Sequence, residues 1–132
     1  MLFTFLISSF VIGADINISV GRGLQFNPSN VDASVGDTII WTFYGSYSVS
    51  EGLVCVPNGF DSNVQNTGTF KYIIPQERLN TTINYFCKVQ SHCLQGMTGR
   101  INVKVQSQVQ LPTPTNNANK ISFNYFLLLF LV

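Results

Sequence analysis

The amino-acid sequence predicts an all-β fold, a Greek-key antiparallel β-sandwich of about eight strands. Short runs of apolar and β-branched residues recur through the middle of the chain, and clusters of Gly, Pro, Asn and Ser separate them. Segments 38–43 and 101–105 alternate apolar and polar residues with the period of two that a half-buried strand shows. No segment sustains the period of a helix. Many short strands within about one hundred residues are typical of a two-sheet sandwich.

The first four expected strands are short and closely spaced. Segment 16–20 ends at a Gly-Arg-Gly turn, and segment 24–26 ends at an Asn-Pro-Ser turn. Segment 30–33 is followed by Gly-Asp, after which segment 37–43 carries the clearest alternation. Trp41, the single tryptophan, lies on this alternating strand, and we expect it in the core.

Four more strands follow the same logic. Segment 47–50 begins after Gly-Ser, and segment 70–74 follows the turn sequences Pro-Asn-Gly and Asn-Thr-Gly. Residues 75–79 are compatible with one helical turn. Segments 82–88 and 99–105 are the last two expected strands, and they enclose the most informative loop of the chain.

Composition excludes several function classes. Only 10% of the 132 residues are charged and the net charge is +1, so no basic face is available to hold nucleic-acid phosphates. His92 is the single histidine, which excludes any site that takes two imidazoles from this chain. The carboxylates Glu51, Asp61 and Glu77 are scattered, and no Ser/His/Asp arrangement extends beyond His92. We therefore expect no catalysis.

The two ends predict an extracellular, lipid-anchored protein. Residues 1–14 contain an apolar run of signal-peptide length followed by small residues. Two glycosylation sequons begin at Asn17 and Asn80. Residues 106–119 form a stalk rich in Pro, Thr and Asn that holds the expected attachment site, Asn116 or Asn117. Residues 120–132 are hydrophobic, as in a glycolipid-anchor signal, and the alternative is a disordered tail.

The expected domain, residues 15–105, contains one cluster of soft metal ligands. Cys87, His92 and Met97 follow the spacing Cys-x4-His-x4-Met in the loop between the last two strands. A thiolate, an imidazole and a thioether suit one copper ion, with the thioether as a weak axial ligand. Spacing alone leaves a second interpretation open, in which Met97 fills the core, His92 lies at the surface and the cysteines pair in some other way.

Three stretches resemble the cupredoxins. Segment 85–103, YFCKVQSHCLQGMTGRINV, is similar to their C-terminal copper loop, above all to that of plant phytocyanins and cupredoxin-like extracellular proteins of fungi. Segment 24–43 resembles the entry strands of the family, and segment 55–62, CVPNGFDS, resembles its cysteine-bearing middle loop. The resemblance implies an eight-stranded Greek-key sandwich, a disulfide between Cys55 and Cys93, and Cys87 as the free thiolate of a monomer.

The chain departs from this family at one ligand. The resemblance places a first histidine where this sequence has Tyr47, in the stretch Tyr-Ser-Val-Ser, and no second histidine exists to replace it. Tyr47 would act as a phenolate ligand of an oxidised metal or as a neutral phenol that caps the cavity. Cys87, His92 and Met97 would suffice for Cu(I), whereas reversible redox cycling needs both imidazoles. The competing outcome is an empty pocket in which Cys87 is a small buried hydrophobe.

These features together predict a secreted, surface-anchored cupredoxin-like module with an incomplete type 1 copper site. We expect a structural or interaction role at the cell surface or wall, with copper as the one cofactor that the residues suit. The partners would be the membrane, through the lipid anchor, and components of the wall or surface. The alternative is a copper-binding electron-transfer protein with Cys, His and Met ligands and an altered first ligand.

Overall fold

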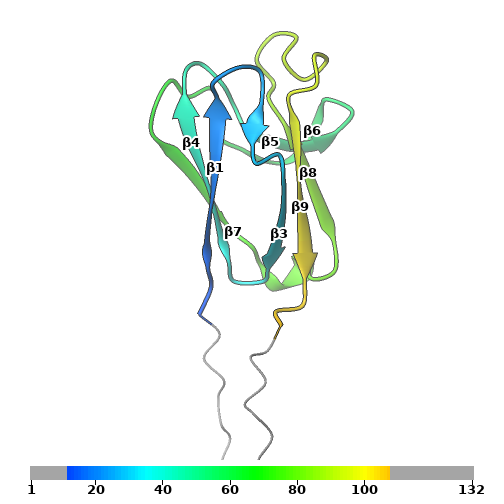
Figure 1. Ribbon diagram of the computed structural model, residues 1–132. Coiled ribbons are helices and arrows are strands. Elements are labelled where there is room, and N and C mark those ends of the chain that lie inside the picture. Colours follow the sequence, from blue (N-terminus) through cyan, green and yellow to red (C-terminus); the bar gives the residue numbers. More distant parts are fainter. Residues whose placement is uncertain (1–11, 108–132) are drawn as a thin grey trace, which may run out of the picture.

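The computed structural model describes residues 12–107, which form nine strands and one 3-10 turn (Figure 1). The elements are β1 (Asp15–Gly21), β2 (Phe26–Asn27), β3 (Asn30–Ser34), β4 (Thr38–Tyr44), β5 (Ser50–Leu53), β6 (Val56–Asp61), β7 (Thr69–Ile73), η1 (Gln76–Arg78), β8 (Thr82–Phe86) and β9 (Thr98–Lys104). The predicted leader is described only at its last three residues. The expected anchor site, Asn116 or Asn117, and the segment 120–132 lie outside the described residues.

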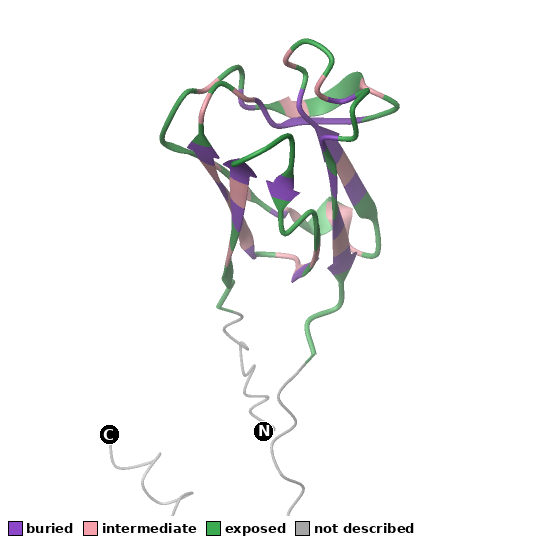
Figure 2. Ribbon diagram, turned by 45° about the horizontal axis from the view of Figure 1, so that its top comes forward, coloured by how far each residue is buried: buried purple, intermediate pink, exposed green. Residues whose placement is uncertain are grey.

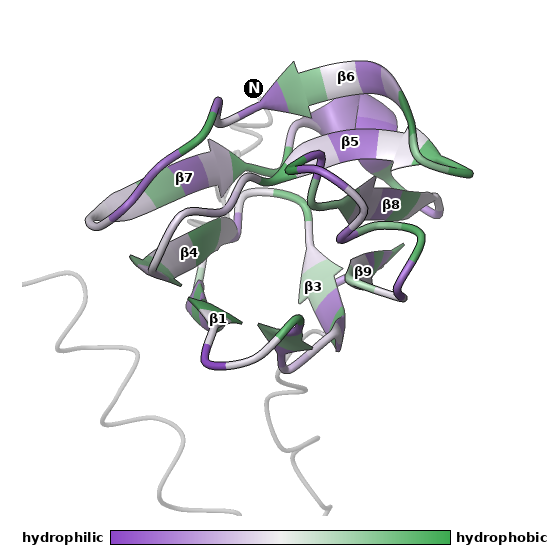
Figure 3. Ribbon diagram, turned by 90° about the horizontal axis from the view of Figure 1, so that it is seen from above, coloured by the Kyte–Doolittle hydropathy of each residue, from purple (hydrophilic) through white to green (hydrophobic). Residues whose placement is uncertain are grey.

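Two sheets face each other, and the predicted all-β sandwich is confirmed. One sheet has the strand order β2-β1-β4-β7 and the other has β3-β9-β8-β5-β6. The sheets are mixed rather than purely antiparallel, because β1 pairs with β4 and β3 pairs with β9 in parallel. After β2 the chain crosses to the other sheet as β3 and returns as β4, and such a crossover lets neighbouring strands run in the same direction. Seen from above, the sheets enclose the core on opposite sides (Figure 3).

Buried residues of both sheets form one hydrophobic core cluster, and Figure 2 shows buried segments on strands of both sheets. Trp41 is fully buried, as expected, and its ring centroid lies 5.3 Å from that of Tyr85 on the opposite sheet. Phe60 and Phe70 lie 5.6 and 5.7 Å from the same tryptophan. Aromatic pairs at such distances contribute about 0.5–1.5 kcal/mol beyond the area that they bury. The aromatic cluster therefore fixes the spacing of the two sheets.

The observed strands differ from the expected ones in two places. The strand expected at 47–50 begins only at Ser50, because the N–H groups of Ser48 and Val49 bond to side chains instead of to a neighbouring strand. Strand β6 was not predicted, since its Pro-Asn-Gly sequence is typical of a turn. It forms at the edge of the five-stranded sheet, where a proline is tolerated.

The two ends of the described chain leave the domain at the same end (Figure 1). The loops that join β4 to β5 and β8 to β9 lie at the opposite end. Within residues 12–107, no helix has the length and apolar character that a membrane crossing requires.

Candidate metal centre

The loop between β8 and β9 is held closed by its own backbone. Cys87 N–H donates to the carbonyl of Met97 at 3.1 Å, so the loop begins and ends at one point. Met97 N–H donates to the carbonyl of His92 at 3.0 Å, and His92 N–H donates to Val89 at 3.0 Å. These bonds fix the backbone of all three predicted ligands relative to one another.

Cys87 and His92 come together as the spacing predicts. The Cys87 Sγ lies 3.4 Å from the His92 Nδ1, within hydrogen-bonding reach for a sulfur atom. Cys87 is fully buried and is the free cysteine of the described chain, whereas His92 is half-buried. The buried thiol therefore faces a partly exposed imidazole.

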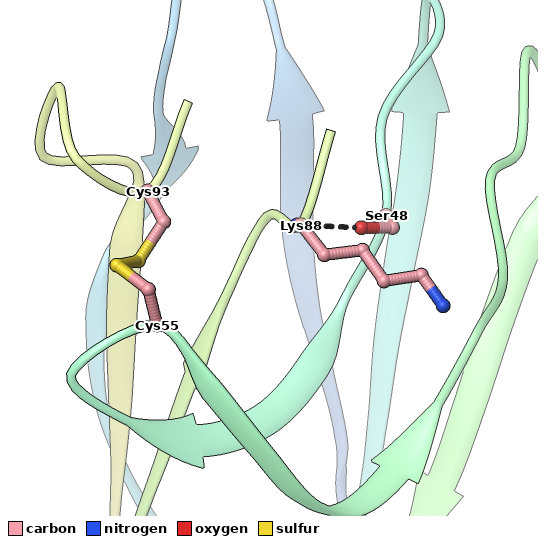
Figure 4. The surroundings of a disulfide bond; sticks show 4 residues. All are labelled: Ser48, Cys55, Lys88 and Cys93. Atoms are coloured by element: carbon pink, nitrogen blue, oxygen red, sulfur yellow. Dashed lines mark hydrogen bonds between the residues drawn. A yellow bond between two sulfur atoms is a disulfide. The ribbon is translucent and has the colours of Figure 1, made fainter. Parts of the chain in front are cut away.

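Ser48 supplies a further contact to the thiol that the sequence reasoning missed. Its backbone N–H donates to the Cys87 Sγ at 3.4 Å, and its Oγ lies 3.9 Å from the same sulfur. The Ser48 Oγ in turn accepts a hydrogen bond of 2.9 Å from the backbone N–H of Lys88 (Figure 4). The only signal for Ser48 in the sequence is its position next to Tyr47.

Met97 is fully buried and belongs to the same core cluster as Cys87. Burial is common to both roles considered for this residue, an axial thioether ligand and a core filler. Its hydrogen bonds to Cys87 and His92 place it in the loop that carries both other ligands.

Tyr47 lies beside His92, with ring centroids 5.5 Å apart and planes tilted by 43°. Its ring covers two glycines: a Cβ built on Gly21 would lie 2.5 Å from the Tyr47 Cε2, and one on Gly45 would lie 2.9 Å from it. Both glycines have positive φ angles, +100° and +126°, which side-chain-bearing residues rarely adopt. Tyr47 also exchanges two backbone hydrogen bonds with Gln65. The phenol ring is thus held in a slot that only glycines leave open.

The disulfide joins Cys55 to Cys93, which confirms the pairing implied by the resemblance (Figure 4). Cys93 follows His92 directly, so the bond ties the ligand loop to the tip of the β5–β6 hairpin. At that tip Val54 and Cys55 have positive φ angles of 53° and 60°. A β-branched residue is rarely found in this conformation, so the hairpin tip is strained.

The predicted glycosylation sites are both exposed. Asn17 lies on β1, and Asn80 follows η1 with a φ of 59°. Their exposure leaves room for a glycan, and their occupancy stays a prediction.

Several solved structures have a similar fold. A mutant plastocyanin of a fern matches with a TM-score of 0.53 and 17% identity, over 67% of this chain and 99% of that chain. Auracyanin from the photosynthetic bacterium Roseiflexus castenholzii matches with a TM-score of 0.51 and 17% identity, over 70% and 98%. The purple cupredoxin from Nitrosopumilus maritimus matches with 0.51 and 22%, over 67% and 98%. The fold is that of the cupredoxins. No protein-family model and no curated protein matches the chain.

The donor atoms of this cupredoxin-like domain fit a soft metal ion. The described residues contain no group of three or more His, Cys, Asp and Glu side chains placed to hold a metal. The available donors are instead the thiol of Cys87, the imidazole of His92 and the thioether of Met97, with the phenol of Tyr47 close to the imidazole. Thiolate and thioether sulfur select Cu(I) over the harder divalent ions.

Proposed function

We propose that this protein is a secreted, surface-anchored cupredoxin-like module with an incomplete type 1 copper site, without catalysis of its own. Its role is structural or in interaction at the cell surface or wall. One observation carries the proposal: the aromatic neighbour of the single histidine ring, His92, is Tyr47, at the position where the resemblance puts the first histidine ligand. The second imidazole of a type 1 site is replaced by a phenol.

This replacement changes the chemistry of the site. A blue-copper centre is a trigonal set of two imidazoles and one thiolate with a weak axial ligand, and it serves both oxidation states of copper. Tyr47 in its neutral form is a poor donor, and its ring packs over Gly21 and Gly45 instead of standing free. We assign it the role of a cap over the buried thiol and imidazole. In this proposal reversible electron transfer is lost while the sandwich is kept.

A second candidate function rests on the contact between Cys87 Sγ and His92 Nδ1, which remains at 3.4 Å. In this alternative the protein is a copper-binding electron-transfer protein with an altered first ligand. Cys87, His92 and Met97 would hold the copper, and a copper ion bound there would supply one-electron exchange. The Ser48 N–H, which donates to the Cys87 Sγ, would help to orient this sulfur.

Several features support the extracellular location. The disulfide is of a kind found in oxidising compartments, and both sequons are exposed. Since the described chain ends opposite the ligand loop, an anchor that follows residue 107 would leave this loop pointing away from the membrane (Figure 1). That orientation would let the loop end bind wall or surface components. In this proposal the module is a monomer.

An anaerobic Cu(I) titration followed by exposure to air separates the two candidates. We expect the wild-type protein to develop no blue charge-transfer band after oxidation, whether or not it takes up Cu(I). A strong blue band would overturn the first proposal. The second fails if no tight copper binding is found, or if Cys87→Ser binds copper as tightly as the wild type. Ser91→Ala, which alters an exposed loop residue outside the ligand set, is the matched control.

A further inference from the structure

A cavity borders the loop of the candidate metal centre, because Cys93 and Gly96 of that loop line it. It has a volume of about 560 Å³, and its other lining residues come from β2, β3, β5, β8 and β9, from the turns before β2 and β3, and from the β5–β6 hairpin tip. None of Cys87, His92, Met97 and Tyr47 lines it. A volume of this size is in the usual range for pockets that bind small molecules.

A row of three polar residues crosses its floor. Arg100 on β9 pairs with Asn30 on β3 and with Asn84 on β8, so the three residues are direct neighbours across adjacent strands. Neighbouring strands are about 4.8 Å apart, so residues in one such row lie on the same face of the sheet. Ile83 and Tyr85 point into the core, and the row therefore belongs to the outer face. The result is one guanidinium with an amide on either side.

The charge of Arg100 is not neutralised by the lining. None of the described residues that line the cavity carries a carboxylate. Asp32, next along β3 on the same face, bonds to Lys104 and Asn102. Arg100 takes part in none of the three ion pairs found within residues 12–107. Its exposed guanidinium is therefore free to bind an anionic ligand.

The walls add both polar and apolar groups. Gln25 and Ser29 line one side, and Thr98 lies beside Arg100 on β9 with a further hydroxyl. The hairpin tip contributes Leu53 and Val54, residues that are 59% and 90% exposed. Such exposed apolar side chains can cover the C–H surface of a ligand while amides and hydroxyls bind its polar groups. The disulfide and the strained turn hold this wall in place.

We propose that this pocket binds an acidic saccharide, a sugar whose ring carries one carboxylate or sulfate group. The Arg100 guanidinium would bind the anion through its forked donors, which match a carboxylate in geometry. Asn30 and Asn84 each offer a donor and an acceptor, which is what sugar hydroxyls require. Arg100 is the single cationic residue among the described residues of the lining, so the pocket can neutralise one negative charge on the sugar ring that it binds. Because none of Cys87, His92, Met97 and Tyr47 lines the pocket, sugar binding here does not depend on copper binding.

The test is a binding titration of the full secreted chain at low salt, by calorimetry and by amide NMR shifts. The probes are trigalacturonic acid and the neutral galactotriose. We expect the acidic sugar to bind, with shifts centred on β8, β9 and the β5–β6 hairpin, and Arg100→Gln to weaken it about ten-fold or more. Arg100→Lys keeps the positive charge but not the forked pair of donors, so its affinity for the acidic sugar should lie between those of the wild type and Arg100→Gln.

Arg22→Gln is the matched control, because Arg22 is an exposed arginine outside the lining that stacks on Tyr44. It should bind the acidic sugar as the wild type does. Equal affinity of wild type and Arg100→Gln would overturn the proposal, as would equal binding of the neutral sugar or shifts confined to another face. Inorganic sulfate that binds as tightly as the saccharide would reduce the site to a simple anion site and overturn the sugar assignment. An Arg100→Gln spectrum with native dispersion establishes that this exposed change leaves the fold intact.

Discussion

Replacing Cys55 and Cys93 together by alanine removes the covalent link between the hairpin tip and the loop that carries His92. The two cysteines are 38 residues apart in sequence. Closing a loop of that length lowers the entropy of the unfolded chain enough to stabilise the fold by about 4 kcal/mol. Since the free energy of unfolding of such domains is about 5–15 kcal/mol, the double variant should remain folded but with a much smaller free energy of unfolding. The double change also leaves Cys87 as the one thiol, which prevents disulfide exchange.

Urea unfolding of wild type and double variant measures this directly. With a slope of about 1–2 kcal/mol per molar urea, the midpoint should fall by about 2 M or more. The reduced wild-type protein is the control, and its midpoint should agree with that of the double variant. A loss of less than about 1 kcal/mol would refute the reasoning, because it would mean that the bond does not constrain the unfolded chain. We also expect weaker copper binding, since His92 adjoins Cys93.

Three further predictions concern single residues. Tyr47→His supplies a second imidazole and should give a blue colour with Cu(II) in visible spectra; a folded but colourless variant contradicts the assignment of the missing ligand. Val54→Asn relieves a valine at positive φ and should raise the free energy of unfolding by about 1 kcal/mol, measured as a higher urea midpoint, whereas a lower midpoint argues against strain there. Burial raises the pKa of Asp61, but hydrogen bonds from Lys88 and the Asn63 N–H outweigh this and hold its pKa below the ordinary value. Its carboxylate therefore stabilises the fold above about pH 4 and loses this effect as the pH falls through the lowered pKa. The free energy of unfolding of Asp61→Asn should therefore decline less than that of the wild type between pH 7 and about pH 3. An equal decline in both proteins contradicts the pairing.

The strands were largely predictable because turn residues mark their ends. Gly, Pro and Asn clusters delimit β1, β3, β4 and β9 to within about two residues. The same rule fails for β6, whose turn-like residues form an edge strand that pairs with β5. Pairing partners that are far apart in sequence, such as the parallel pair β1 and β4, depend on the packing of the two sheets and leave no local pattern.

The candidate site was predictable only where its residues are close in sequence. The spacing of Cys87 and His92 predicts that they meet, and the structure brings their ligand atoms to 3.4 Å. The contact of Ser48 with the thiol joins segments 39 residues apart, and no local pattern indicates it. The slot that Gly21 and Gly45 form for Tyr47 is likewise invisible until β1 and β4 lie side by side. The row that contains Arg100 depends on register across three strands, which the sequence does not display.

The most direct test of the central claim, that a phenol has replaced one imidazole and ended type 1 copper chemistry, is the metal content and visible spectrum of protein purified from its native source. The account predicts an oxidised sample with no blue charge-transfer band. An intensely blue protein with one Cu(II) per chain would contradict it, provided that no second chain supplies a histidine ligand to the site.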